Sequence, residues 1–358
     1  MQEQIATEIS EKLRLRLTSE QKKRLTKQHT HDTEAYQLYL KGRFYSSRRT
    51  EESIQRSFEY FQQAIERDPS YSLPYADMAV AYLFAQFYTM MAPSVGLPRA
   101  RAAVAKALEL DPSNAEARAT LAMILSAFEW NNGAAEKEFL RAIELNPNSS
   151  VTLYFYATHL IQLGRPTEAE AAARRALKID PLSAYHNNFL AVSLVCEKKY
   201  EAAAEQLRKS LEIDPSFANA HAWLSSALFH AGRHAEAITQ IQKGLDLSGG
   251  DVWMRCLLAM FEGLTGRKER AMAQLQEILS LAEHRYVSPV HLSQVYFGLG
   301  DFDKVFDLLE KAFQDRDPVL RSVFVLPAFQ DAAHHDPRFQ DLVRRIHSFA
   351  GASLSGAA

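Results

Sequence analysis

The sequence predicts an all-α protein, a right-handed α-solenoid of about eight helical hairpins with an N-terminal helical linker and a C-terminal capping helix. Three series of residues in the 358-residue chain support this prediction. Prolines that follow an acidic or amide residue recur at Pro69, Pro112, Pro147, Pro181 and Pro215. Alanines recur every 34 positions at Ala135, Ala169, Ala203, Ala237 and Ala271, and glycines share that register at Gly164, Gly232, Gly266 and Gly300. Three series in one register indicate a repeat array, in which each unit packs on its neighbours.

Each series has a physical role in a stack of hairpins. A proline lacks a backbone donor and restricts the residue before it, so it ends one hairpin before the next begins. An alanine lets the two helices of a hairpin approach closely, and a glycine supplies the left-handed conformation of the turn between them. Between these markers apolar residues recur at spacings of three and four, as at Leu190, Leu194, Leu207 and Leu211, which predicts two amphipathic helices.

This pattern resembles the tetratricopeptide repeat of about 34 residues. One repeat matches it through Leu190, Ala191, Leu194, Ala203, Leu207 and Pro215, and the next through Leu224, Ser225, Leu228, Gly232, Ala237 and Ile241. The sequence departs from it where Lys198 takes the place of the turn glycine, Ser210 and Gly244 that of a second-helix alanine, and Gly249 that of the proline. In this register the array covers 32–319, as repeats at 32–69, 72–112, 116–149, 150–183, 184–217, 218–251, 252–285 and 286–319, with an insertion at 89–98 between the helices of the second repeat.

The two ends of the chain differ from the repeats. We expect 1–31 to form an amphipathic helical linker, because Ile5, Ile9, Leu13 and Leu17 share one helical face. Residues 320–350 are expected to cap the open end of the stack, with one apolar stripe formed by Phe339, Leu342, Val343, Ile346 and Phe349. The small, polar tail at 351–358 is expected to be disordered.

Both ends also resemble parts of large bacterial signalling proteins, which carry a winged-helix or Ser/Thr kinase domain. The stretches 5–17 and 32–42 are similar to the segment that joins a sensor-like domain to the repeats there, and 336–345 is similar to their C-terminal end. The resemblance implies a regulatory arm in the cytoplasm, or outside it if the parent protein carries an upstream membrane helix. It makes an effector domain of the same parent protein one candidate partner.

Composition excludes several other functions. The formal net charge is −2 and basic residues are mixed with acidic ones, which argues against nucleic acid as a partner. No apolar run is long enough to insert into a membrane. His230 and His234 straddle the turn at Gly232, and neither Cys196 nor Cys256 is accompanied by a recognisable activating group, so we expect no metal, no cofactor and no catalytic site. An enzyme would need a catalytic domain that this sequence lacks.

The tetratricopeptide resemblance implies that a ligand lies along the concave side, against the first helix of each repeat. The matching positions are Tyr154, Thr158, Gln162, Tyr185, Asn188, Val192, Asn219, Ser226, Phe229, Trp253, Cys256, Met260, Gln294 and Phe297. The set is neutral, aromatic and rich in amides, which favours a protein or peptide segment with apolar anchors. Two alternatives stay open: the groove binds a small apolar ligand and signals to an effector domain, or some of these aromatics simply pack inside a tightly closed stack.

Overall fold

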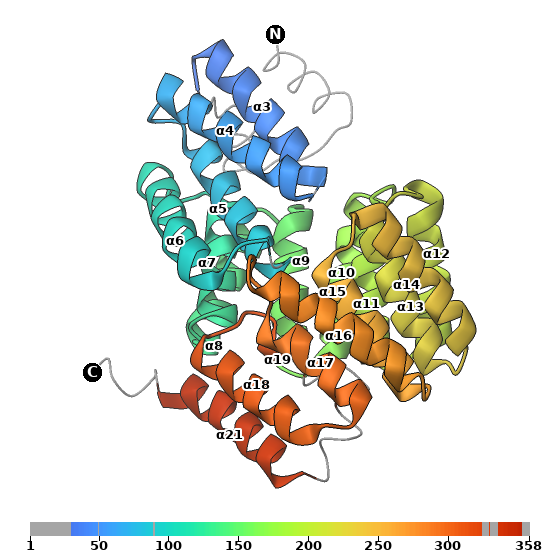
Figure 1. The fold of residues 1–358 in the computed structure, drawn as a ribbon. Helices are drawn as coiled ribbons and strands as arrows, with labels where there is room; N and C mark the ends of the chain where they lie inside the picture. The colour runs from blue at the N-terminus through green and yellow to red at the C-terminus, as the bar shows by residue number, and fades with distance from the viewer. Residues whose placement is uncertain (1–29, 49, 89, 324–328, 330–335, 353–358) are drawn as a thin grey trace.

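The computed structural model describes residues 30–48, 50–88, 90–323, 329 and 336–352. These residues form consecutive helical hairpins stacked into one curved array, which confirms the predicted all-α solenoid (Figure 1). The first four hairpins are α3 (Thr33–Arg48) with α4 (Glu51–Arg67), α5 (Ser72–Phe87) with α6 (Pro93–Leu110), α7 (Ala115–Ala127) with α8 (Asn132–Leu145), and α9 (Ser150–Gln162) with α10 (Pro166–Ile179). The next four are α11 (Ala184–Cys196) with α12 (Tyr200–Ile213), α13 (Ala218–His230) with α14 (His234–Ser248), α15 (Val252–Leu264) with α16 (Lys268–Ala282), and α17 (Pro289–Leu299) with α18 (Phe302–Gln314).

The turn inside a hairpin repeats one backbone feature with a period of 34 residues. Positive φ angles occur at Trp130 (58°), Gly164 (71°), Lys198 (59°), Gly232 (79°), Gly266 (83°) and Gly300 (81°). Glycine adopts this left-handed conformation without strain, whereas a residue with a Cβ does not. Lys198 nevertheless adopts this conformation, and so does Trp130, which lies 34 residues before Gly164 at the equivalent turn position. The turn geometry is therefore fixed by the array as a whole, even where the local residue opposes it.

Small residues hold the helices of each hairpin close together. The alanines of the 34-residue series, Ala135, Ala169, Ala203, Ala237 and Ala271, are all 0% exposed. Where the sequence departs from alanine, the contact is still close: the Ser210 hydroxyl donates to the Ala184 carbonyl at 2.6 Å, and a Cβ on Gly244 would lie 3.2 Å from the Ala218 oxygen. Gly249 ends α14 in the left-handed conformation and so replaces the missing proline as a helix stop.

The second hairpin differs from the sequence prediction. The expected insertion at 89–98 is not a loop throughout, because α6 begins at Pro93 and contains 93–98 as its first turns. A proline at the start of a helix sets the required φ and lacks only an N–H that would have no partner there. Pro98 then lies inside the same helix. The connection between the two helices therefore spans only 88–92.

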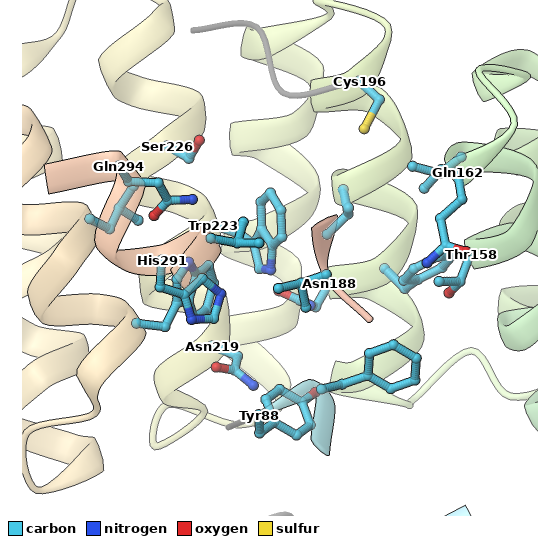
Figure 2. Close-up of a pocket in the computed structure, with 18 of the residues that line it drawn as sticks. Tyr88, Thr158, Gln162, Asn188, Cys196, Asn219, Trp223, Ser226, His291 and Gln294 are labelled. Carbon is cyan, nitrogen blue, oxygen red and sulfur yellow. The ribbon is translucent and has the colours of Figure 1, made fainter. Parts of the chain in front are cut away.

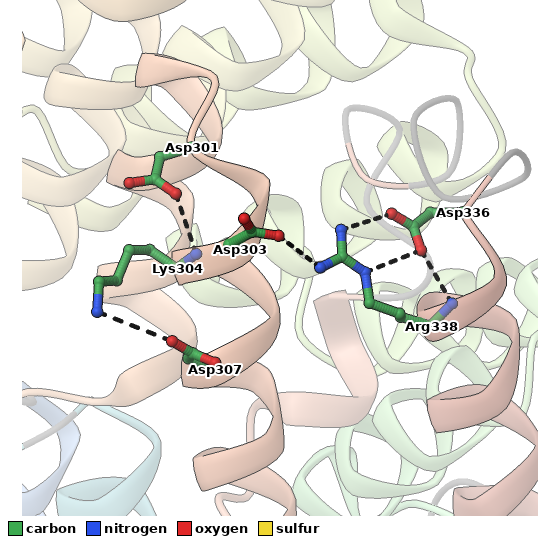
Figure 3. A network of polar contacts seen from close by, with 6 residues as sticks. All are labelled: Asp301, Asp303, Lys304, Asp307, Asp336 and Arg338. Atoms are coloured by element: carbon green, nitrogen blue, oxygen red, sulfur yellow. Dashed lines mark hydrogen bonds and ion pairs between the residues drawn. The ribbon is translucent and has the colours of Figure 1, made fainter.

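The C-terminal helix α21 (Pro337–Ala352) covers the last hairpin. Its Phe339, Leu342 and Ile346 are buried, and it packs against α18. Arg338 joins the two helices by donating to Asp303 of α18 at 2.7 Å, and it also donates to Asp336, the residue before α21, at 2.9 Å (Figure 3). Because α21 extends to Ala352, the first two residues of the expected disordered tail are helical. The rest of that tail, 353–358, and positions 1–29 of the expected linker lie outside the described residues.

The array curves until its C-terminal part meets its middle. In Figure 1 the orange helices α17 and α18 return toward α7, α8 and α9, and the short helix α19 (Leu320–Val323) contacts α9. The rings of Trp130, after α7, and Phe313, in α18, are 5.1 Å apart. These contacts join the C-terminal part of the array to its middle. In the part of the chain that the structure describes, no helix has the length and apolar character to cross a membrane.

Candidate binding groove

A cavity of about 200 Å³ lies on the concave side of the array (Figure 2). The first helices α9, α11, α13, α15 and α17 contribute most of its wall, because stacking places the same face of each first helix toward the inside of the curve. Eleven of the positions expected from the sequence line it: Tyr154, Thr158, Gln162, Tyr185, Asn188, Val192, Asn219, Ser226, Trp253, Met260 and Gln294. Residues up to 140 positions apart in the sequence are thus brought to one surface.

Three of the expected positions do not line the cavity. Phe229 stacks on Phe261, with ring centroids 4.1 Å apart and planes 7° apart. Phe297 stacks against Phe329 at 4.7 Å, and Cys256 is 0% exposed inside a separate apolar cluster. These side chains pack the array, so for them the structure favours the alternative in which groove-register residues belong to the core.

Several residues of the cavity were not expected from the sequence. Trp223 and His291 both flank Trp253, with centroid distances of 5.7 and 6.1 Å. Each lies three residues before an expected position, Trp223 before Ser226 and His291 before Gln294, so a wider helical face would have included them. Val319 and Phe329 also line the cavity, but they follow the last repeat and share no register with it. No periodic signal could have identified those two.

Apart from Asp251, no Asp, Glu, Lys or Arg side chain is among the described residues that line the cavity. Asn188, His291 and Gln294 are each more than nine-tenths buried, and the Asn188 Oδ1, His291 Nδ1 and Gln294 Oε1 atoms have no hydrogen-bond partner among the described residues. Burial lowers the pKa of His291 to about 3, so its ring is uncharged at neutral pH. Buried polar atoms normally have partners, so these side chains suit a ligand that forms hydrogen bonds without carrying a charge.

A wider cavity of about 840 Å³ adjoins the first one. Tyr88, Tyr185, Asn219 and Asp251 line both. The wider cavity also contains charged residues from the first hairpin and from the connection after α16, where the Arg285 guanidinium and the Glu51 carboxylate lie 3.9 Å apart. The mostly apolar first cavity is therefore continuous with a more polar one, which lies between the first hairpin and the connections after α14 and α16.

The chain itself enters the concave side through a segment that we call the clasp, residues 313–321. Gln162, one of the expected groove residues, donates from Nε2 to the Pro318 carbonyl at 3.5 Å. Arg321 donates in return to the Gln162 carbonyl at 3.1 Å. Val319 of the clasp lines the cavity. Part of the groove predicted for a partner is thus in contact with the chain's own C-terminal segment.

Asp317 anchors the clasp on the opposite wall. It is 1% exposed and accepts hydrogen bonds from the Tyr286 hydroxyl at 2.9 Å and the Ser288 hydroxyl at 2.7 Å. The backbone N–H of Val319, also in the clasp, donates to the Asp317 carboxylate at 2.9 Å. Burial raises the pKa of the Asp317 carboxyl, and these three donors oppose that shift. The clasp therefore bridges α9 and the start of α17.

The cysteines and the paired histidines have packing roles. Cys196 lines the cavity as a free thiol, and burial raises its pKa to about 12, so it carries no thiolate at neutral pH. His230 stacks on Tyr200 at 5.4 Å, whereas His234 stacks on Phe229 at 4.5 Å. Among the described residues no group of three His, Cys, Asp or Glu side chains could hold a metal ion.

Stacked hairpins around a concave cavity define a helical-repeat scaffold. Models of the tetratricopeptide repeat family match residues 131–184 and 194–254, so this part of the chain consists of tetratricopeptide repeats, which generally act as scaffolds for protein interactions. No curated protein matches the sequence.

Solved structures share the fold. A monomeric mutant of IFIT1 with Gppp-AAAA is 16% identical with a TM-score of 0.60, over 98% of this chain and 75% of that chain. The human IFIT1 dimer with PPP-AAAA is 17% identical with a TM-score of 0.55, over 74% of this chain and 69% of that chain.

Proposed function

We propose that the concave groove binds an extended segment of a protein partner without chemical turnover. An apolar or aromatic side chain of the partner occupies the cavity, and the amides on its wall bond to the partner's main chain. The clasp is the observation that carries this proposal. The groove already accepts Val319 at the cavity and bonds to the Pro318 carbonyl through Gln162, so it holds an apolar side chain and a neighbouring main-chain carbonyl of a protein segment.

The chemistry of the wall supports a neutral, apolar anchor. Tyr154, Tyr185 and Phe189 form a cluster with centroid distances of 4.8 Å for Tyr154 to Tyr185 and 4.5 Å for Tyr154 to Phe189. Large aromatic side chains contribute much of the binding free energy at interfaces, and amides bond to a backbone without requiring a charge. The partner is either a separate protein or an effector domain of a longer parent protein.

Affinity measurements with groove variants test this function. Cross-linking followed by mass spectrometry identifies the partner, and calorimetry then compares Tyr185→Ala and Trp253→Ala with the unchanged chain. Each substitution should weaken binding by about 1–3 kcal/mol while the helical circular dichroism stays the same. Met272→Ala is the control, because this side chain is 54% exposed on α16. If neither groove variant changes the affinity, the partner binds elsewhere.

A second candidate function is the sensing of a small apolar ligand. The volume of about 200 Å³ favours it, since an engineered cavity of about 150 Å³ holds benzene. Native mass spectrometry of the purified chain discriminates the two functions. A retained small molecule that Trp253→Ala releases would support the sensor, whereas an empty chain that binds a peptide segment would support the scaffold.

A further inference from the structure

Arg321 is a buried cation held by neutral groups. It is 3% exposed, and its guanidinium donates to the Ser126 carbonyl at 3.0 Å, the Asn132 Oδ1 at 2.9 Å and the Gln162 carbonyl at 3.1 Å. No carboxylate among the described residues pairs with it. Burial lowers the pKa of Arg321 to about 10, so the side chain remains charged at neutral pH.

The ends of two helices compensate this charge. Ser126 lies in the last turn of α7 and Gln162 is the last residue of α9. Carbonyls in the last turn of a helix lack intrahelical donors and carry the negative end of the helix dipole. The planar guanidinium has several donors in a fixed arrangement, so it can bond to both carbonyls and to the Asn132 amide at once. These helix ends therefore form a built acceptor for one guanidinium, and Gln162 connects it to the cavity, which this residue also lines.

We propose that this acceptor is an arginine-binding position of the groove, which Arg321 fills in cis and an arginine of a protein partner fills in trans. The inference rests on the proposed function, since it needs extended segments to bind at the concave side. A second guanidinium position lies nearby, where Arg316 is centred 4.0 Å over the ring of Trp130. The matching partner is a segment with two arginines about five residues apart, which the clasp separates by Asp317, Pro318, Val319 and Leu320.

The backbone of the clasp favours exchange. Arg316 has a φ of 53°, a left-handed conformation that residues other than glycine rarely adopt. A partner without this constraint can present the same arginines from a relaxed chain. The clasp then acts as an internal competitor, and it lowers the apparent affinity of any arginine-bearing segment by the fraction of time that it occupies the groove.

A fluorescein-labelled peptide with the sequence of residues 313–323 tests the proposal by anisotropy against the full chain. Arg321→Ala empties the acceptor, so we expect this variant to bind the peptide at least about tenfold more tightly than the unchanged chain does, because the competitor is weakened. The matched control is the same peptide with alanine in place of its second arginine, which should lose that gain. Equal weak binding to both chains, or tight binding of the alanine peptide, would overturn the proposal.

Arg321→Lys provides a second test if Arg321→Ala does not fold. A lysine keeps the charge but cannot bond to both carbonyls with a planar fork, so its peptide affinity should fall between those of the other two chains. The Trp253→Ala substitution separates this proposal from the proposed function. In one outcome, Trp253→Ala weakens the binding of a natural partner while neither Arg321 variant gains affinity for the peptide. That result would support the groove as a binding site and contradict the arginine-binding position. If the peptide binds as expected and no partner depends on Trp253, only the proposed anchor is wrong.

Discussion

Arg321 donates a hydrogen bond to the carbonyl of Ser126 at 3.0 Å, although 195 residues separate the two in the sequence. Contacts in a repeat array are otherwise made between neighbouring units, so that its ends unfold most easily. The clasp instead attaches the last hairpin to the third and fourth. Local stability near the C-terminus should therefore depend on a contact with the middle of the array.

Hydrogen exchange can measure this dependence. In the Arg321→Ala chain, amides of α17 and α18 should lose protection by at least about tenfold, because a hydrogen bond to a charged group contributes about 1.5–3 kcal/mol. Amides of α3 and α4, at the other end of the array, serve as the control and should be unchanged. Equal loss at both ends would mean that the substitution destabilises the whole chain and that the clasp has no local role.

The close contact inside a hairpin predicts strong position dependence for added volume. Ala203 is 0% exposed between the helices, whereas the side chain of Glu205, two residues later, is 69% exposed. Ala203→Leu should lower the free energy of unfolding by about 1–3 kcal/mol through overpacking, and Glu205→Leu should change it little. Urea titrations of the two variants give the comparison. Similar midpoint shifts would contradict the hairpin register.

Strain at the turn predicts a stabilising substitution. Lys198 holds a φ of 59° at a position where other repeats have glycine. Lys198→Gly should raise the free energy of unfolding by about 1 kcal/mol, because the left-handed conformation disfavours a Cβ by about 1–2 kcal/mol. The greater flexibility of glycine in the unfolded chain offsets part of that gain. Gly232→Ala is the reverse test, since a Cβ there meets nothing within 4 Å and only the backbone conformation is affected. Thermal melts should shift in opposite directions.

The repeat register was sufficient to predict the hairpins and the face that lines the cavity. Those features follow from local rules, such as helix periodicity and turn residues, that recur in each unit. Phe229 and Phe297 share that register, but each stacks on a phenylalanine about one repeat later and so packs into the core. The clasp could not be predicted, because Arg321 bonds to helix ends that only the curvature of the complete array brings within reach.

Two buried histidines predict a loss of stability in mild acid. Burial lowers the pKa of both His159 and His291 to about 3, and the positive charge of Arg321 adds to the shift at His159. The unfolded chain takes up protons near pH 6.5 while the folded chain does not, so stability falls as the pH drops through 6.5 and continues to fall toward pH 3. At pH 5 each histidine should account for about 2 kcal/mol of that loss.

Urea titrations between pH 7 and 5 should therefore show a clearly shallower decline of the free energy of unfolding for the His159→Gln/His291→Gln chain. The same substitution at the exposed His284 is the control. An unchanged slope in the double variant would show that these rings become protonated in the folded protein as readily as in the unfolded chain.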